Sequence, residues 1–158
     1  MKLSDFVVKE AIVPELKSTA RDAVIRELVT ALAAAKALAP SEVDAVVKAI
    51  VNRERNGSTG LGKGVAVPHV RHAAVKKSVA AVGRSAIGVD FAALDQAPVY
   101  SVFLLISPLA NPDGHLQAME IIFRNLQEDT FRRFLRQSDT RQKIVDLIEE
   151  ADQTGAPR

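Results

Sequence analysis

The chain has 158 residues, a length that is sufficient for one globular domain with its own core. Of these residues, 47% are hydrophobic and 25% are charged, an ordinary globular composition. It contains no cysteine, which excludes disulfides and thiolate metal sites and fits a reducing cytosol. The net charge of +2 does not by itself indicate a nucleic-acid or membrane partner, and a single tyrosine without tryptophan makes a base-stacking surface unexpected.

The N-terminal half is predicted to be extended at first and then helical. Asp5 and Glu10 interrupt the apolar residues of the N-terminus, so no signal peptide is expected, and no apolar run reaches the ~20 residues that cross a bilayer. A short extended segment, residues 11–13, precedes two helices that should run to about Leu38 and about Arg55. In the first helix the apolar residues that recur at helical spacing are Val24, Ile25, Leu28, Val29, Leu32 and Ala35. The buried stripe of the second is expected to be Val43, Val46, Val47, Ile50 and Val51.

Strands are predicted in the middle of the chain. They are expected at residues 65–67, 78–86 and 99–107. The first should stop at Pro68, because proline cannot donate a backbone hydrogen bond to a neighbouring strand. The third, VYSVFLLIS, is rich in β-branched and aromatic residues and should lie in the centre of a sheet.

The C-terminal part is predicted to be helical. Asp113 is expected to cap a helix whose apolar residues are Leu116, Met119, Ile122, Phe123 and Leu126, and shorter helices are expected near residues 131–135 and 141–151. No internal repeat or linker divides the chain. We therefore assign residues 1–152 to a single α/β domain and residues 153–158 to a disordered tail.

The stretch RERNGSTGLGKGVAVPHVRH, residues 53–72, is the densest run of small and polar residues. Four glycines fall within eight positions, so the backbone can turn tightly and approach a ligand closely. Ser58 and Thr59 offer hydroxyls beside these glycines, Arg53 lies upstream, and His69 follows Pro68 directly. Such an arrangement suits an anion, and phosphate most of all.

The pattern R-E-x-x-G-S-T-G-x-G-x-G-x-A-x-P-H in this stretch closely resembles a known active-site signature. It is that of the enzyme IIA domain of the phosphoenolpyruvate-dependent sugar phosphotransferase system, of the fructose/mannitol type that includes the nitrogen-regulatory IIA proteins. Gly114-His115-Leu116 is similar to a second motif of the family. The resemblance covers the chain from about Leu3 to about Glu150 and implies a mixed β-sheet flanked by helices on both faces.

The resemblance implies a phosphohistidine carrier. His69 would accept a phosphoryl group from an HPr-type protein, on the outer imidazole nitrogen Nε2, and pass it to a IIB partner in sugar uptake, with no metal or nucleotide cofactor. A neutral imidazole can act as a nucleophile near neutral pH, and an arginine recognises phosphate with a planar fork. The residues expected to act are His69, His115 and Arg53 as catalytic groups, and Ser58, Thr59 and Gly60 as phosphate-binding groups.

Two other functions of the same fold stay open. The protein could be a regulatory module of the nitrogen-regulatory kind, whose phosphorylation state controls partner proteins. It could also have lost phosphotransfer, because Val70 stands where the family often has glycine and Lys63 where it commonly has asparagine. Neither substitution removes a group that the chemistry needs.

Other chemistries are weighed against this hypothesis. His69, His72 and His115 could form a zinc site, but no carboxylate pattern supports it, and His72 is taken to be incidental. Residues 57–63 match the first seven positions of a nucleotide P-loop, but the eighth is Gly64 instead of the serine or threonine that binds magnesium. Glu54 is expected to be solvated at a helix end rather than to orient Arg53.

Overall fold

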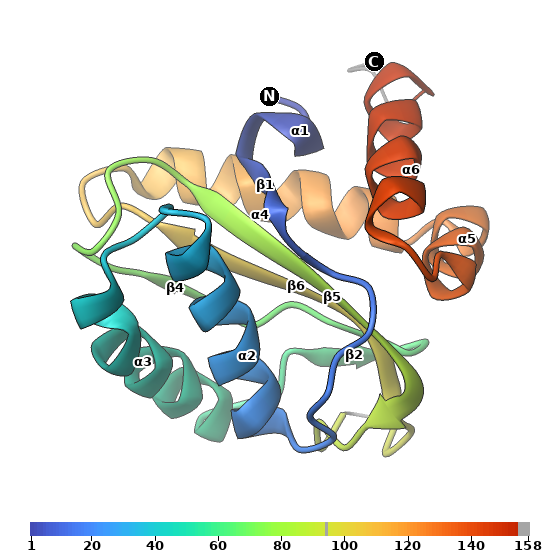
Figure 1. The fold of residues 1–158 in the computed structure, drawn as a ribbon, viewed down its shortest axis with the longest axis horizontal. Helices are drawn as coiled ribbons and strands as arrows, with labels where there is room; N and C mark the ends of the chain where they lie inside the picture. Colours follow the sequence, from blue (N-terminus) through green and yellow to red (C-terminus); the bar gives the residue numbers. More distant parts are fainter. Residues whose placement is uncertain (94, 155–158) are drawn as a thin grey trace.

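A mixed six-stranded sheet forms the centre of the fold and has helices on both faces, in the computed structural model of residues 1–93 and 95–154 (Figure 1). The strands are β1 (Val7–Val13), β2 (Gly60–Gly62), β3 (Val65–Ala66), β4 (His69–Arg71), β5 (Val79–Val89) and β6 (Val99–Ser107). The helices are α1 (Leu3–Phe6), α2 (Arg21–Ala34), α3 (Val43–Arg55), α4 (Pro112–Leu126), α5 (Asp129–Gln137) and α6 (Arg141–Thr154), with a short 3₁₀ helix η1 (Pro40–Glu42). The predicted α/β fold class is confirmed.

The strand order is β1-β5-β6-β3-β2, and β4 also pairs with β6. β5 and β6 are antiparallel, whereas β3 and β4 both run parallel to β6. They lie beside successive parts of it, with Val65 opposite Ser101 and His69 opposite Leu105. The carboxyl ends of β4 and β6 therefore meet at one edge of the sheet, where a site can form.

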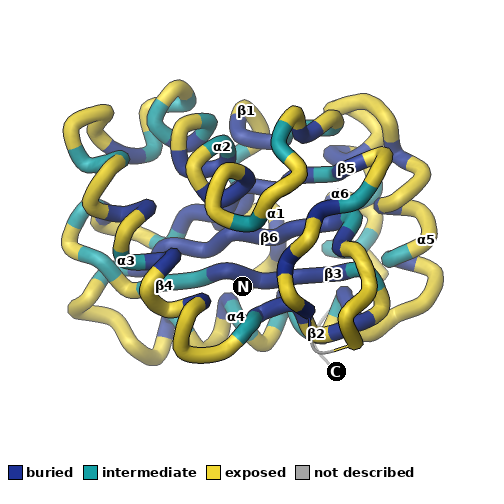
Figure 2. The backbone as a smooth tube through the Cα atoms, turned by 90° about the horizontal axis from the view of Figure 1, so that it is seen from below, coloured by how far each residue is buried: buried dark blue, intermediate teal, exposed yellow. Residues whose placement is uncertain are grey.

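The sheet separates two hydrophobic cores. Along β6, Val102, Leu104 and Ile106 pack with α2 and α3 on one face, while Phe103 and Leu105 pack with α1, α4, α5 and α6 on the other. This alternation follows from the two-residue period of a strand. Figure 2 shows the buried strands enclosed between the partly exposed helices. Because β6 is buried on both faces, its predicted central position is confirmed.

The predicted strand 65–67 differs from the structure, in which β3 covers only Val65–Ala66 and a further strand, β4, begins at His69. Pro68 does not end the pairing, because its carbonyl accepts a hydrogen bond from the Leu105 amide at 3.0 Å. Proline lacks a donor but keeps its acceptor, so the chain stays beside β6. His69 is thus held by a strand, not placed after one.

Two helix ends also differ from the prediction. α2 ends at Ala34 because Lys36 adopts a left-handed φ of 64°, and the Ala37 amide donates to the Leu32 carbonyl at 2.9 Å. α6 extends to Thr154, two residues into the expected tail, whose residues 155–158 lie outside the described residues. Within the described part of the chain, no helix has the length and apolar character needed to span a membrane.

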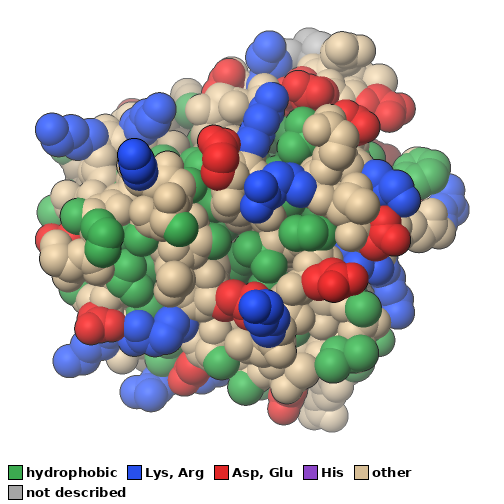
Figure 3. Space-filling model, viewed as in Figure 1, with side chains coloured by type: hydrophobic (Ala, Val, Ile, Leu, Met, Phe, Trp, Pro, Cys, Tyr) green, Lys and Arg blue, Asp and Glu red, His purple; other side chains and the backbone are tan. Residues whose placement is uncertain are grey.

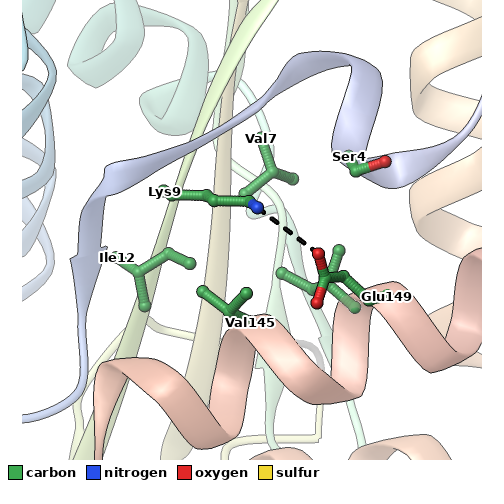
Figure 4. Close-up of a pocket in the computed structure, with 7 residues that line it drawn as sticks. Ser4, Val7, Lys9, Ile12, Val145 and Glu149 are labelled. Carbon is green, nitrogen blue, oxygen red and sulfur yellow. Dashed lines mark hydrogen bonds and ion pairs between the residues drawn. The ribbon is translucent and has the colours of Figure 1, made fainter.

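Two surface hollows contain neither His69 nor His115. One, of about 10 Å³, is lined by Ser4, Val7, Lys9, Ile12, Val145, Ile148 and Glu149, and an exposed Lys9–Glu149 ion pair of 3.3 Å lies across it (Figure 4). The other, of about 600 Å³, is lined by residues of α2 and α3. Figure 3 shows the face seen in Figure 1, where acidic and basic side chains are interspersed and no histidine is visible. Both hollows are lined by residues outside β4 and β6.

Candidate functional site

His69 is the first residue of β4 and is half-buried. Its Nδ1 lies 2.7 Å from the carbonyl oxygen of Val67. A carbonyl can only accept a hydrogen bond, so in the neutral ring Nδ1 carries the proton and donates it. Nε2 then holds the free lone pair, and it forms no hydrogen bond within residues 1–93 and 95–154. His69 is therefore prepared to act as a nucleophile through Nε2.

His115 lies in the first turns of α4, which follows β6 after a short loop. Asn111, not the predicted Asp113, caps this helix: its Oδ1 accepts the Gly114 amide at 2.9 Å. Pro112 is the first helical residue, a position that suits its fixed φ, and this moves the helix start upstream of the predicted cap. A Cβ at position 114 would lie 2.4 Å from Nδ2 of Asn111, so a larger residue there would displace the capping side chain.

The two histidine rings face a common site. Their centroids are 5.6 Å apart and their planes are inclined by 44°. Nδ1 of His115 lies 2.8 Å from Oγ of Ser107, the last residue of β6. Both rings thus use Nδ1 for an internal contact, and within the described ranges neither Nε2 has a hydrogen-bond partner. The two rings are neighbours, so a group bound to one of them lies close to the other.

Both imidazoles are held in the neutral form. Burial lowers the pKa of His69 and the Arg53 guanidinium acts in the same direction, whereas the hydrogen bond to Val67 and the charge of Glu54 oppose the shift. Burial also lowers the pKa of His115 to about 4, with smaller contributions from the charges of His69 and Arg71. A neutral His69 keeps its nucleophilic lone pair even in mildly acidic solution.

We expect His115 to titrate with a midpoint of about 4 when its ring protons are followed by NMR. The pKa of both rings is lower in the folded chain than the ordinary value of 6.5, so the unfolded chain binds more protons below that value. Their contribution to the free energy of unfolding should be complete above pH 6.5 and should fall as the pH decreases toward about 4. In a His69→Ala variant, which removes one of the causes, the midpoint of His115 should rise. A His115 midpoint at 6.5 or higher would contradict this description of the site.

Two arginines contribute positive charge. Arg53, in the last turn of α3, is exposed, and its Nη1 donates to the Gly57 carbonyl at 2.9 Å. Arg71 is exposed and lies two residues after His69 on β4, and its charge acts on His115. The structure thus brings together three predicted residues, His69, His115 and Arg53, and adds Arg71, which was not predicted. Had the strand His69–Arg71 been predicted, the same-face spacing of residues 69 and 71 would have indicated Arg71.

The glycine loop uses its polar groups internally. Ser58 Oγ donates to the Phe91 carbonyl at 3.2 Å and accepts from the Gly60 amide at 3.0 Å. Thr59 is buried, and its hydroxyl donates to Glu54. A Cβ at Gly60 would lie 2.8 Å from Cβ of Ala93, so glycine allows a close approach at this point. These three residues shape the loop beside Arg53, and in this structure both hydroxyls are committed to protein partners.

Glu54 is buried, with 2% of its surface exposed, so the prediction of a solvated side chain is wrong. Its carboxylate accepts hydrogen bonds from the Thr59 amide, at 3.0 Å, and from the Thr59 hydroxyl. The spacing was informative: residues 47, 50, 51 and 54 recur at three and four positions and share the buried face of α3. Through these two hydrogen bonds, Glu54 holds the start of the glycine loop against α3.

Glu54→Ala should lower the free energy of unfolding by about 2 kcal/mol, because the buried Thr59 amide would lose its acceptor. Urea unfolding followed by circular dichroism measures this change. The control is Glu120→Ala, which removes an exposed helical glutamate that pairs with Arg124 at 3.4 Å and should cost less than about 0.5 kcal/mol. Equal urea midpoints for Glu54→Ala and the wild-type protein would show that the loop does not depend on this carboxylate.

Two further sequence predictions have clear outcomes. Leu116, one of the apolar residues of the predicted helix, is 66% exposed, because Gly114, Ala118, Ile122 and Leu126 form the buried face of α4. His72 lies beyond the end of β4, and its Nδ1 accepts the Ala74 amide at 3.0 Å, so its ring closes a turn. Within the described residues, no group of three or more His, Cys, Asp or Glu side chains is placed to hold a metal ion.

Comparison with known proteins places this geometry in context. Residues 5–151 match the family model described as "Phosphoenolpyruvate-dependent sugar phosphotransferase system, EIIA 2". The chain is 34% identical over 152 residues to the PTS system fructose-specific EIIABC component of Bacillus subtilis. The aligned region covers 96% of this chain but only 24% of that protein. It is 33% identical over 148 residues to a nitrogen regulatory protein of Bradyrhizobium diazoefficiens, covering 94% of this chain and 95% of that one.

A solved structure agrees with these relatives. The nitrogen regulatory protein IIA-Ntr from Neisseria meningitidis superimposes with a TM-score of 0.81 at 27% identity, over 92% of this chain and 98% of that chain. The similarity therefore extends over most of the fold.

Proposed function

Since the chain belongs to the EIIA type 2 family of the phosphoenolpyruvate-dependent sugar phosphotransferase system, whose members are phosphoryl carriers, we propose that His69 accepts the phosphoryl group on Nε2. The donor would be an HPr-type carrier protein and the acceptor a IIB partner in sugar uptake. The observation that carries the proposal is the hydrogen bond from His69 Nδ1 to the Val67 carbonyl, 2.7 Å long, which leaves Nε2 as the free nucleophile.

The transfer is a displacement at phosphorus. The lone pair of His69 Nε2 forms the new nitrogen–phosphorus bond while the bond to the donor's nitrogen breaks, and that nitrogen leaves with the electron pair. Because charge spreads over the three oxygens during this step, catalysis depends on groups that meet those oxygens. Arg53 and His115 would supply them, and Arg71 would add positive charge.

We retain Ser58, Thr59 and Gly60 as predicted phosphate-binding residues. Their support is their place in the loop that follows Arg53, which donates to the Gly57 carbonyl at 2.9 Å. Binding through the hydroxyls would require Ser58 to release Phe91 and Thr59 to release Glu54. Alternatively, the loop that these residues form would contribute to phosphate binding indirectly, by positioning Arg53.

A regulatory function is the second candidate. It is favoured by the relative from Bradyrhizobium diazoefficiens, a nitrogen regulatory protein that the chain matches over 95% of its length. Sugar transfer is favoured by the Bacillus subtilis relative, whose name places an A, a B and a C component in one protein. The chemistry at His69 is the same in both functions, and only the partner that follows differs. The cysteine-free composition fits a relay in the cytoplasm.

A reconstituted relay tests the proposal. The protein would be incubated with phosphoenolpyruvate, enzyme I and an HPr-type carrier, and a IIB protein would then be added. Phosphorylation of this chain followed by its loss to IIB is expected for sugar transfer. Phosphorylation that is retained in the presence of several IIB proteins would support regulation instead. The absence of any phosphorylation of the folded chain, with several carriers tried, would contradict both.

A further inference from the structure

A pair of serines lies behind His115. Ser107 is fully buried at the end of β6, and its Oγ is 2.8 Å from Nδ1 of His115. Ser78 immediately precedes β5, and its hydroxyl donates to Ser107 Oγ at 3.0 Å. β5 and β6 are antiparallel with Val79 opposite Ile106, so the next step of the register brings the two serines together. Neither serine belongs to the sequence signature.

The direction of the bond from Ser78 to Ser107 determines the direction of the bond between Ser107 and His115. A serine hydroxyl has one proton to donate. Ser78 gives its proton to Ser107, so the proton of Ser107 is left for its second contact, Nδ1 of His115. A nitrogen that accepts a hydrogen bond carries no proton in a neutral ring, and burial favours the neutral ring here. The single proton of His115 is then on Nε2.

His69 has the opposite arrangement. Its Nδ1 faces the Val67 carbonyl at 2.7 Å, which can only accept, so Nδ1 carries the proton and Nε2 is bare. Two neighbouring rings, with centroids 5.6 Å apart, therefore hold opposite tautomers. One presents a lone pair at Nε2 and the other presents an N–H at Nε2. A phosphoryl group needs both, a nucleophile for its phosphorus and a donor for its oxygens.

We propose that Ser107, oriented by Ser78, is a positioning residue that holds His115 in the Nε2–H tautomer, so that His115 donates a hydrogen bond to the phosphoryl group carried by His69. The inference rests on the proposed function of His69. The proton stays on His115 throughout, because the ring supplies a hydrogen bond and transfers nothing. The serines touch neither the phosphoryl group nor its partner.

The tautomer can be read directly by nitrogen NMR. In protein with ¹⁵N-labelled histidine at pH 8, before any phosphorylation, protonated and bare ring nitrogens resonate at well-separated positions. We expect His115 to show a bare Nδ1 and a protonated Nε2, and His69 the reverse. Ser107→Ala should give a mixture of the two tautomers at His115, because nothing then holds Nδ1. Ser78→Ala should shift the populations in the same direction, less strongly.

Phosphoryl transfer provides the second measurement. Ser107→Ala should slow single-turnover transfer to His69 by about tenfold, the effect of weakening one hydrogen bond to a charged group. The matched control is Ser101→Ala, which removes another buried serine of β6, six residues from Ser107, and should change neither the tautomer nor the rate.

The outcomes separate this proposal from the function on which it rests. A protonated Nδ1 at His115 in the wild-type protein would overturn it, as would a folded Ser107→Ala variant with an unchanged tautomer and rate. If the wild-type tautomers are as expected but His69 takes up no phosphate from any carrier, the proposed function fails and the donor role of His115 fails with it. Opposite tautomers, together with a slowed but complete phosphorylation of Ser107→Ala, would support both.

Discussion

His69→Ala is expected to take up no phosphate from an HPr-type carrier, whereas the wild-type protein takes up one group. The variant lacks the Nε2 lone pair that forms the nitrogen–phosphorus bond. His115 cannot replace it, because its contact with Ser107 at 2.8 Å leaves the proton on the nitrogen that faces the site. Intact-mass spectrometry at alkaline pH, where phosphohistidine survives, measures the uptake.

His72→Ala is the matched control for this experiment. His72 is also an imidazole near the carboxyl end of β4, but its ring closes a turn by accepting the Ala74 amide at 3.0 Å. We expect it to take up phosphate as the wild-type protein does. Phosphorylation of a folded His69→Ala protein would contradict the assignment of His69 as the phosphorylated residue. Loss of phosphate uptake in a folded His72→Ala protein would show that the phosphorylated histidine has been misassigned.

Arg53→Ala is expected to slow phosphorylation of His69 by about 100-fold, the usual effect of removing one preorganised donor from a site where charge develops. The guanidinium acts on His69 through its charge and is held at the end of α3 by its hydrogen bond to Gly57. The alanine variant should also raise the pKa of His69, because one cause of its lowering is removed. Single-turnover transfer from a phosphorylated carrier measures the rate.

Arg55→Ala controls for loss of positive charge alone. Arg55 lies in the same last turn of α3 and is also exposed. Its removal should change the rate by less than about threefold, because a screened surface charge contributes little. Arg53→Lys should fall between Arg53→Ala and the wild-type protein, since lysine keeps the charge but lacks the planar fork. Equal rates for Arg53→Ala and Arg55→Ala would remove Arg53 from the catalytic groups.

The parts of the fold predicted best are those whose hydrophobic pattern is strong. β6 spans Val99–Ser107 as predicted, and α3 ends at Arg55 as predicted. β1 was only partly recognised, because the register shift between Val7 and Ile12 disturbs the alternation of buried residues that marks a strand. β4 was missed because Pro68 reads as a strand end, although its carbonyl continues the pairing with β6.

The site was predictable as far as its residues lie within motifs. The glycine-rich signature indicated His69 and Arg53, and the His-Leu pair indicated His115. The position of Glu54 on the apolar face of α3 indicated that it is buried. The sequence analysis did not use this position, because it considered Glu54 only as a solvated side chain or as a group that orients Arg53. The contacts of Ser78 with Ser107 and of Ser107 with His115 could not be found, because they depend on the pairing of β5 with β6 and on the position of α4 beside the end of β6. Tertiary contacts of this kind leave no local pattern.

The most direct test of the account is to locate the phosphorus on the phosphorylated wild-type protein. With ¹⁵N-labelled histidine, phosphorus–nitrogen coupling measured at alkaline pH identifies the atom that carries the group. The geometry predicts one phosphoryl group on Nε2 of His69, with Nδ1 of the same ring still donating to the Val67 carbonyl. Coupling to Nδ1 of His69, or to either nitrogen of His115, would contradict it.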